Sequence, residues 1–174
     1  MKILWFCNSP ISDLSTSSGT WMGAMAKALL NTQGIDLCII AQGQDRDFSR
    51  HDCQGIRQWL VPVASSLGPK GLPTKKILHD IVNAVNEFVP DLIQIWGTES
   101  FWGLLTARRL IDFPAILTVQ GNVSAITEVY LGGLSFFELL RCIGVREVLK
   151  GLTPWQAKEA FKKKSKYERE IIKG

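Results

Sequence analysis

The sequence predicts an α/β fold, namely a doubly wound, mostly parallel, Rossmann-like sheet with helices on both faces. Short apolar runs alternate along the chain with amphipathic stretches that have helical spacing. Within each run, successive positions are apolar, which is typical of strands buried on both faces of a parallel sheet. Right-handed crossovers then place helices on both sides of that sheet. At 174 residues and 46% hydrophobic content, we expect one domain over residues 1–174.

The first elements follow from apolar runs and the residues that interrupt them. Strands are expected over residues 2–7, 36–41 and 55–63, with Pro62 at a strand end or on an edge strand because it has no N–H to donate. A helix is expected over residues 19–31, between the first two strands. Its expected buried face consists of apolar residues at helical spacing: Trp21, Met22, Met25, Ala26, Leu29 and Leu30.

The alternation continues from Thr74 onward. Thr74 is the expected N-cap of a helix over residues 75–89, whose apolar stripe consists of Ile77, Ile81, Val85 and Phe88. The remaining elements are expected as a strand over 90–97, a helix over 99–111, a strand over 114–121, helices over 135–143 and 145–152, and a basic helix over 155–174.

The net charge of +4 lies entirely on the C-terminal helix. Residues 155–174 hold seven Lys or Arg and three Glu, whereas residues 1–154 hold 13 of each sign. We expect this helix to pack on the body with a basic outer face, and contact with an anionic membrane surface is the second interpretation. Because no run of 18 apolar residues occurs, no transmembrane segment is expected. No nucleic-acid partner is expected.

The cysteines and histidines indicate neither a disulfide framework nor a metal site. Cys7 and Cys38 lie in expected strands, and the four cysteines have no CxxC spacing, so reduced thiols in a cytoplasmic protein are expected. His51 falls in a charged loop and His79 in the middle of a helix, which argues against a metal site or a catalytic triad. We expect no cofactor.

In a doubly wound sheet, ligands bind at the carboxyl ends of the strands, which selects residues 8–20, 41–45, 97–101 and 120–125. The first of these segments contains neither GxGxxG nor GxxxxGK[ST], the two standard phosphate-binding loops. Gly19 nonetheless opens a helix whose free N–H groups attract anions. A plain connection, with a serine capping the helix, explains the same residues.

Polar residues follow two later strands. Glu99 lies where a carboxylate could meet a substrate hydroxyl, although the helix dipole also favours an acid there. Gln120 and Asn122 carry amides suited to sugar hydroxyls, and Gly121 allows close backbone approach. A polar turn is the alternative for these three residues. Convergence of the strand ends on one sheet edge favours a binding site.

Taken in order, these features resemble the N-terminal lobe of a GT-B glycosyltransferase of the glycosyltransferase family 4-like group (group 1 glycosyltransferases). Residues 1–10 and 18–30 resemble the family's first strand, glycine loop and first helix. Residues 90–97 resemble the strand usually written PDxxHxHG, and residues 114–121 a later strand that ends in HG or HD. Residues 164–174 resemble a helix whose glutamate precedes the family's next strand, so the similarity covers nearly the whole chain.

The resemblance implies a parent enzyme that transfers a sugar, of hexosyl type, from a nucleotide-sugar donor to a glycan or lipid-linked acceptor, as in polysaccharide biosynthesis. The expected location is the cytoplasm, and a peripheral position at the inner face of the membrane is left open. This lobe would supply the acceptor side of the cleft and no catalytic residue. The implied roles are donor-phosphate contact for Gly19 and Thr20, contact with the transferred sugar for Gln120 and Gly121, and acceptor contact for Glu99 and Asn122.

The chain departs from the family pattern at three positions. Gln120 replaces a histidine that contacts the donor sugar in many members, and Gln94 and Trp96 replace the histidines of the earlier strand. Gln120 can hydrogen-bond hydroxyl groups but cannot carry a proton near neutral pH.

Family members have a second lobe that binds the nucleotide-sugar, and the 174 residues of this chain do not include one. We therefore expect a truncated chain that is inactive alone and that works together with such a lobe. The basic helix and the loop over 67–72 are then candidates for membrane or acceptor contact. The alternative is a non-catalytic flavodoxin-like binding or signalling domain, although the paired acids of a receiver domain do not follow the first strand. A nucleotide-dependent oxidoreductase is disfavoured by the missing GxGxxG.

Overall fold

The computed structural model describes residues 1–12, 21–62, 68, 70–141, 143–144 and 153–174. Its centre is a six-stranded sheet of order β3-β4-β2-β1-β5-β6, in which every neighbouring pair is parallel except β3 and β4. The predicted α/β class, with a doubly wound and mostly parallel sheet, is confirmed. The strands are β1 (Lys2–Cys7), β2 (Asp36–Gly43), β3 (Ser49–Cys53), β4 (Ile56–Pro62), β5 (Leu92–Trp96) and β6 (Ala115–Thr118).

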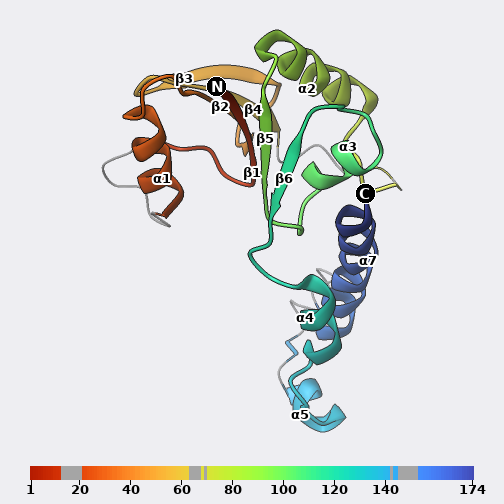
Figure 1. Ribbon diagram of the computed structural model, residues 1–174. Coiled ribbons are helices and arrows are strands. Elements are labelled where there is room, and N and C mark those ends of the chain that lie inside the picture. The colour runs from red at the N-terminus through yellow and green to blue at the C-terminus, as the bar shows by residue number, and fades with distance from the viewer. Residues whose placement is uncertain (13–20, 63–67, 69, 142, 145–152) are drawn as a thin grey trace.

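Helices cover both faces of this sheet (Figure 1). One face packs against α1, and the other packs against α2, α3 and the end of α7. Beyond the edge at which β6 ends, α4, α5 and much of α7 extend away from the sheet (Figure 1). The helices are α1 (Trp21–Leu30), α2 (Lys75–Phe88), α3 (Trp102–Ala107), α4 (Val123–Val129), α5 (Phe136–Arg141) and α7 (Pro154–Lys173).

The central strands explain why the apolar runs are continuous. In β1, Leu4 and Phe6 belong to the core on one face, whereas Ile3 and Trp5 belong to the core on the other. Both sets are buried, because helices shield each face from water. A strand in this position has no solvent-facing side and therefore shows no alternation of polar and apolar residues.

Helix α2 forms where the sequence predicts it. Thr74 is its N-cap, and the Oγ1 atom accepts a hydrogen bond from the Ile77 N–H at 3.4 Å. The predicted stripe is confirmed, since Ile77, Ile81, Val85 and Phe88 are all buried. The helix packs with this stripe on the core shared by β1, β2, β4 and β5.

Two predictions for the first half of the chain are wrong in detail. His51 lies in the antiparallel edge strand β3 rather than in a loop. In α1, Ala26 is buried, but Trp21 and Met25 are exposed, so the apolar face is narrower than expected. The predicted capping turn before α1 and the predicted helix over 145–152 fall on residues outside those described.

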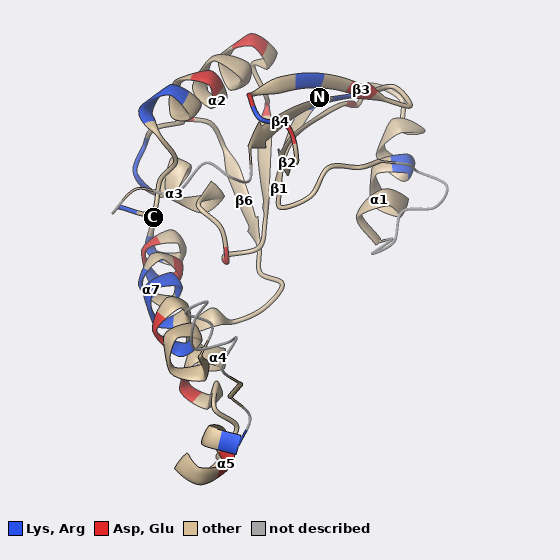
Figure 2. Cartoon of the chain, turned by 180° about the vertical axis from the view of Figure 1, so that it is seen from behind, with Lys and Arg blue, Asp and Glu red and all other residues tan. Residues whose placement is uncertain are grey.

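Helix α7 packs along α4 and α3. Its N-terminus is closed by a capping box in which Thr153 and Gln156 exchange hydrogen bonds. Gly103 of α3 permits close contact, because a Cβ there would overlap the Ile171 side chain. Lysine and arginine positions recur along α7 (Figure 2), and most of them are exposed, so the expected packing with a basic outer face is confirmed. None of the described helices is long and apolar enough to cross a bilayer.

Candidate functional site

The carboxyl ends of three parallel strands are joined by polar side chains. Asn8, directly after β1, donates from Nδ2 to Oε1 of Glu99 at 2.9 Å. Gln42, near the end of β2, donates from Nε2 to Oγ of Ser100 at 2.7 Å. The Oδ1 atom of Asn8 accepts a hydrogen bond from Nε1 of Trp102 at 3.2 Å, which fixes the orientation of the amide. These contacts bring the predicted segments after β1, β2 and β5 together.

Gly97, two residues before Glu99, allows the Glu99 side chain to lie close to the backbone. Gly97 has a φ of +87°, a conformation that side-chain-bearing residues rarely adopt. A Cβ at this position would also overlap the Glu99 carboxylate. Position 97 therefore favours glycine for two reasons: the positive φ of the turn that ends β5, and the space that the Glu99 carboxylate occupies. The Gly97 N–H donates to the Thr118 carbonyl at 2.9 Å, which continues the pairing with β6.

A cavity of about 350 Å³ opens beside this cluster. Its volume lies at the lower end of the range for small-molecule sites. Four parts of the chain contribute to it, namely the turn after β5, helix α3, the loop before α2 and one side of α7. The lining residues are Gly68, Gly71, Thr98, Glu99, Ser100, Phe101, Leu104, Ala160, Lys163, Lys164 and Tyr167.

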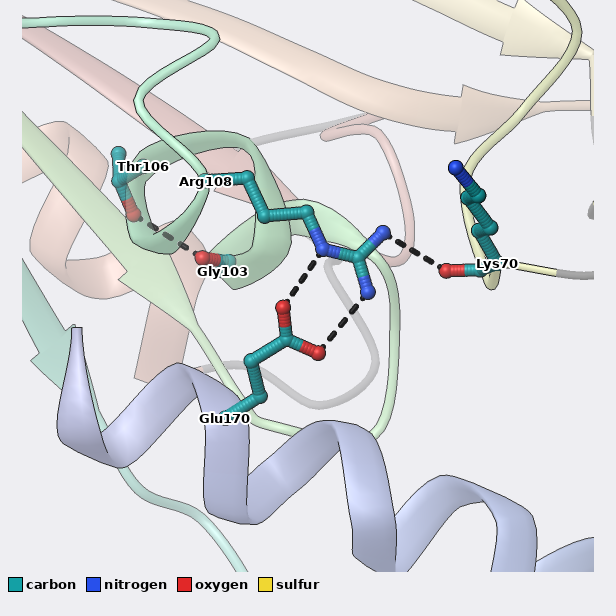
Figure 3. Close-up of polar contacts among 5 residues, drawn as sticks. All are labelled: Lys70, Gly103, Thr106, Arg108 and Glu170. Carbon is teal, nitrogen blue, oxygen red and sulfur yellow. Dashed lines mark hydrogen bonds and ion pairs between the residues drawn. The ribbon is translucent and has the colours of Figure 1, made fainter.

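The loop before α2 is fixed to α7 through Arg108, the residue directly after α3 (Figure 3). Arg108 donates to both carboxylate oxygens of Glu170, at 2.7 and 2.9 Å, and to the Lys70 carbonyl at 2.8 Å. The hydrogen bond from Arg108 lowers the pKa of Glu170, so the pair stays ionised near neutral pH. Gly71 lies against the Tyr167 ring, since a Cβ there would come within 2.6 Å of it. Gly71 and Tyr167 line the cavity, so these contacts hold together the loop and the helix that form one of its walls.

The side chain of Glu168 ties α7 to the sheet and to α4. The carboxylate accepts hydrogen bonds from Thr98 Oγ1 at 2.7 Å, from the N–H groups of Val123 and Ser124 at 2.8 Å each, and from Ser124 Oγ at 2.7 Å. Glu168 is 1% exposed. Burial opposes ionisation, but the hydrogen bonds from Ser124, Thr98 and the two amides outweigh it and hold the pKa of Glu168 below its usual range.

The structure distributes the predicted site residues unevenly. Glu99 lines the cavity, whereas Gln120 lies exposed on the loop that follows β6. Gly121 accepts a hydrogen bond at its carbonyl from Thr98 Oγ1 at 3.4 Å. Asn122 caps α4, because its Oδ1 accepts from the Ala125 N–H at 2.8 Å. The predicted residues Gly19 and Thr20 lie outside the described part of the chain.

Sequence reasoning missed most of the residues that surround Glu99. Asn8, Gln42 and Ser100 all fall within the segments selected by the strand-end rule, so polarity at a strand end was the available signal. The strand-end rule does not select Lys163 and Lys164, because they reach the cavity from a helix more than sixty residues further along the chain. The sequence named that basic helix as a whole as a candidate for membrane or acceptor contact.

The cavity combines groups that suit a polyhydroxylated ligand. The Glu99 carboxylate accepts hydrogen bonds, and the Ser100 hydroxyl, which accepts one from Gln42, has a proton free to donate. Phe101 and Tyr167 offer apolar ring surface to C–H groups. In the described part of the chain, no three His, Cys, Asp or Glu side chains gather as metal ligands.

Comparison with known proteins leaves the family open. No family model matches the sequence, and no curated protein matches it. Among solved structures, the fold is similar to sucrose-phosphate synthase from Thermosynechococcus elongatus, with a TM-score of 0.46 and 11% sequence identity. The match covers 80% of this chain and 39% of that chain, so this chain spans about two fifths of that protein's length. A similarity at this level assigns neither a family nor an activity.

Proposed function

We propose that this chain is the acceptor-side lobe of a glycosyltransferase that transfers a sugar from a nucleotide-sugar to a glycan or lipid-linked acceptor. The observation that carries the proposal is the cavity at the carboxyl end of β5, where Glu99 and Ser100 face a space of about 350 Å³. The order of motifs along the sequence, which resembles the family 4-like N-terminal lobe, supports it. The doubly wound sheet is the architecture that such a lobe requires.

Glu99 is the residue proposed to contact the acceptor. Asn8 engages Oε1 of the carboxylate, so an acceptor hydroxyl would be received at Oε2. The turn at Gly97 and the bond from Asn8 hold the carboxylate in place before the ligand arrives, which lowers the entropy lost on binding. Ser100, fixed by Gln42, offers a second hydrogen-bonding group on the same turn.

Donor binding is proposed to need a second lobe. In this proposal, Gly19, Thr20, Gln120 and Gly121 border the cleft on the donor side, and the isolated chain neither transfers sugar nor binds a nucleotide-sugar tightly. Calorimetric titration of the chain with UDP- and GDP-sugars tests this point. Micromolar affinity for either sugar nucleotide would show that the lobe is misassigned.

The decisive experiment is a sugar-transfer assay on the full-length gene product that contains this chain. Glu99→Gln removes the charge but keeps the shape of the side chain, and a hydrogen bond to a charged group contributes about 1.5–3 kcal/mol. We therefore expect kcat/KM for the acceptor to fall about tenfold to a hundredfold.

The matched control is Glu87→Gln, on the exposed side of α2 and away from the cavity, which should leave transfer unchanged. Equal activity of the Glu99→Gln and control enzymes would remove Glu99 from the site. Absence of transfer with every nucleotide-sugar tried, in a folded wild-type protein, would favour a non-catalytic binding domain instead.

A further inference from the structure

We infer that the cavity beside Glu99 binds a hydroxyl-bearing ligand that also carries a phosphate group. The inference rests on the proposed function and deepens it, because it names the chemical class of the acceptor. It follows from the placement of Lys163 and Lys164, which line the same cavity as Glu99. The sequence singled out neither lysine, but it named the basic helix that carries both as a candidate for membrane or acceptor contact.

Helical spacing puts both lysines on one stripe of α7. Ala160, Lys163, Lys164 and Tyr167 follow one another at intervals of three, one and three residues, so they share a face of the helix. All four line the cavity. A different stripe, which includes Ser165 and Glu168, faces α4 and is buried. The lysines therefore belong to the cavity wall and not merely to the solvated side of a basic helix.

The acidic residues of α7 are all engaged with other partners. Glu159 pairs with Lys162 at 3.5 Å, Glu170 pairs with Arg108, and Glu168 is buried against α4. Among the described residues, neither cavity lysine forms an ion pair within 4.0 Å. The Lys164 Nζ atom lies 5.6 Å from the centroid of the Phe161 ring, a cation–π contact that brings no negative charge. Neither lysine is therefore paired with a carboxylate in the described part of the chain, and a phosphate with two or more anionic oxygens is the ligand group that matches their two charges.

The Glu99 carboxylate, which is negative where the lysines are positive, determines which end of the ligand lies at which side of the cavity. Glu99 lies on the turn after β5, across from α7, and repels an anion while accepting hydrogen bonds from hydroxyl groups. A phosphate is therefore expected at the α7 side and a hydroxyl at the Glu99 side. Tyr167 lies on the same wall as the lysines. Its ring packs against Gly71, and the Arg108 Cζ atom lies 6.0 Å from the ring centroid.

The phosphate can come from a free sugar phosphate or from a lipid-linked phosphate at a membrane surface. Two probes separate these sources. Glucose 1-phosphate, titrated into the isotopically labelled chain, reports binding through amide shifts of cavity residues such as Thr98 and Ser100. Phosphatidylcholine vesicles with and without phosphatidic acid report binding of a membrane-held phosphate monoester by co-sedimentation.

The test variant is the double substitution Lys163→Gln and Lys164→Gln. The control is Lys162→Gln with Lys166→Gln, which changes the net charge equally on the same helix but outside the cavity lining. Whichever probe binds the wild type, glucose 1-phosphate or phosphatidic acid vesicles, we expect the test variant to bind it at least about tenfold more weakly. The control should bind that probe like the wild type. Glucose without phosphate should bind more weakly than glucose 1-phosphate.

Binding of either probe with this variant pattern supports the inference and identifies the source. Millimolar glucose 1-phosphate and phosphatidic acid vesicles that both leave the chain unchanged would overturn it, as would equal losses in the two double variants. Its failure is distinguishable from failure of the proposed function. If the Glu99→Gln enzyme loses transfer while neither phosphate probe binds, the acceptor site stands and only the phosphate assignment falls.

Discussion

Replacing Glu168 by Gln is expected to destabilise the protein by about 2–4 kcal/mol. Each carboxylate oxygen accepts two hydrogen bonds, Oε1 from Thr98 and the Val123 N–H, and Oε2 from the N–H and hydroxyl of Ser124. The amide of glutamine keeps one acceptor oxygen and puts a donor in place of the other. In either orientation, one buried backbone N–H loses its partner, at a cost of about 1–3 kcal/mol, and the remaining bonds lose their charge assistance.

Urea unfolding monitored by circular dichroism measures this loss. The control is Glu159→Gln, because Glu159 lies on the same helix but is exposed and pairs only at the surface with Lys162 at 3.5 Å. Such a pair contributes about 0–1 kcal/mol, so the control midpoint should hardly move. Hydrogen exchange at the Val123 and Ser124 amides should also accelerate in Glu168→Gln. Equal midpoints for the two variants, with equal urea dependence, would refute the assigned role of Glu168.

The same residue predicts how stability changes in acid. Because the pKa of Glu168 is lower in the folded protein than in the unfolded chain, the unfolded chain takes up the proton first as the pH falls. The stabilisation is therefore complete above the ordinary pKa of glutamate and is lost as the pH falls through the folded pKa. Unfolding free energies measured from neutral to acidic pH should converge between the wild type and Glu168→Gln.

Three further outcomes are expected. Native-state alkylation followed by peptide mapping should modify Cys53 and spare Cys38, because burial raises the pKa of the Cys38 thiol to about 12; modification of Cys38 at the rate of Cys53 would contradict its burial. Gly103→Ala should lower the stability by about 1–3 kcal/mol, since the new methyl group overlaps Ile171, and an unchanged melting temperature would show that α7 can shift freely. If the basic face of α7 contacts membranes, which was the second interpretation of its sequence, binding to phosphatidylglycerol vesicles should weaken with added salt; no binding at low salt would exclude that contact.

The core elements could be predicted because their signals are local. In α2, one hydroxyl at the cap and four apolar residues at helical spacing are enough to specify the start and the buried face. The strands β1 and β2 were equally predictable, since a continuous apolar run can be satisfied only where both faces of a strand are covered.

The edge strand β3 could not be predicted in this way. Its residues Arg50, His51 and Asp52 are polar and exposed, so they show none of the burial that identifies a strand. Only the pairing with β4, established by the turn at Gln54 and Gly55, makes this segment extended. Propensity and periodicity do not register a partner strand, which is why the segment resembled a charged loop.

The β5 side of the candidate site could be predicted from the sequence, whereas the α7 side could not, because only the first has a local signal. Glu99 follows a recognisable strand, so topology alone places it at the ligand-binding edge. Glu168 and the two lysines lie on a helix with seven basic residues and three glutamates, and nothing in the local sequence separates the buried glutamate from the exposed ones. Once Glu168 is bonded to Thr98 and α4, however, the rotation of α7 about its axis is fixed. Because Lys164 precedes Glu168 by one helical turn, that anchor also determines which lysines face the cavity. The charge of the site thus depends on a buried carboxylate that does not line the cavity.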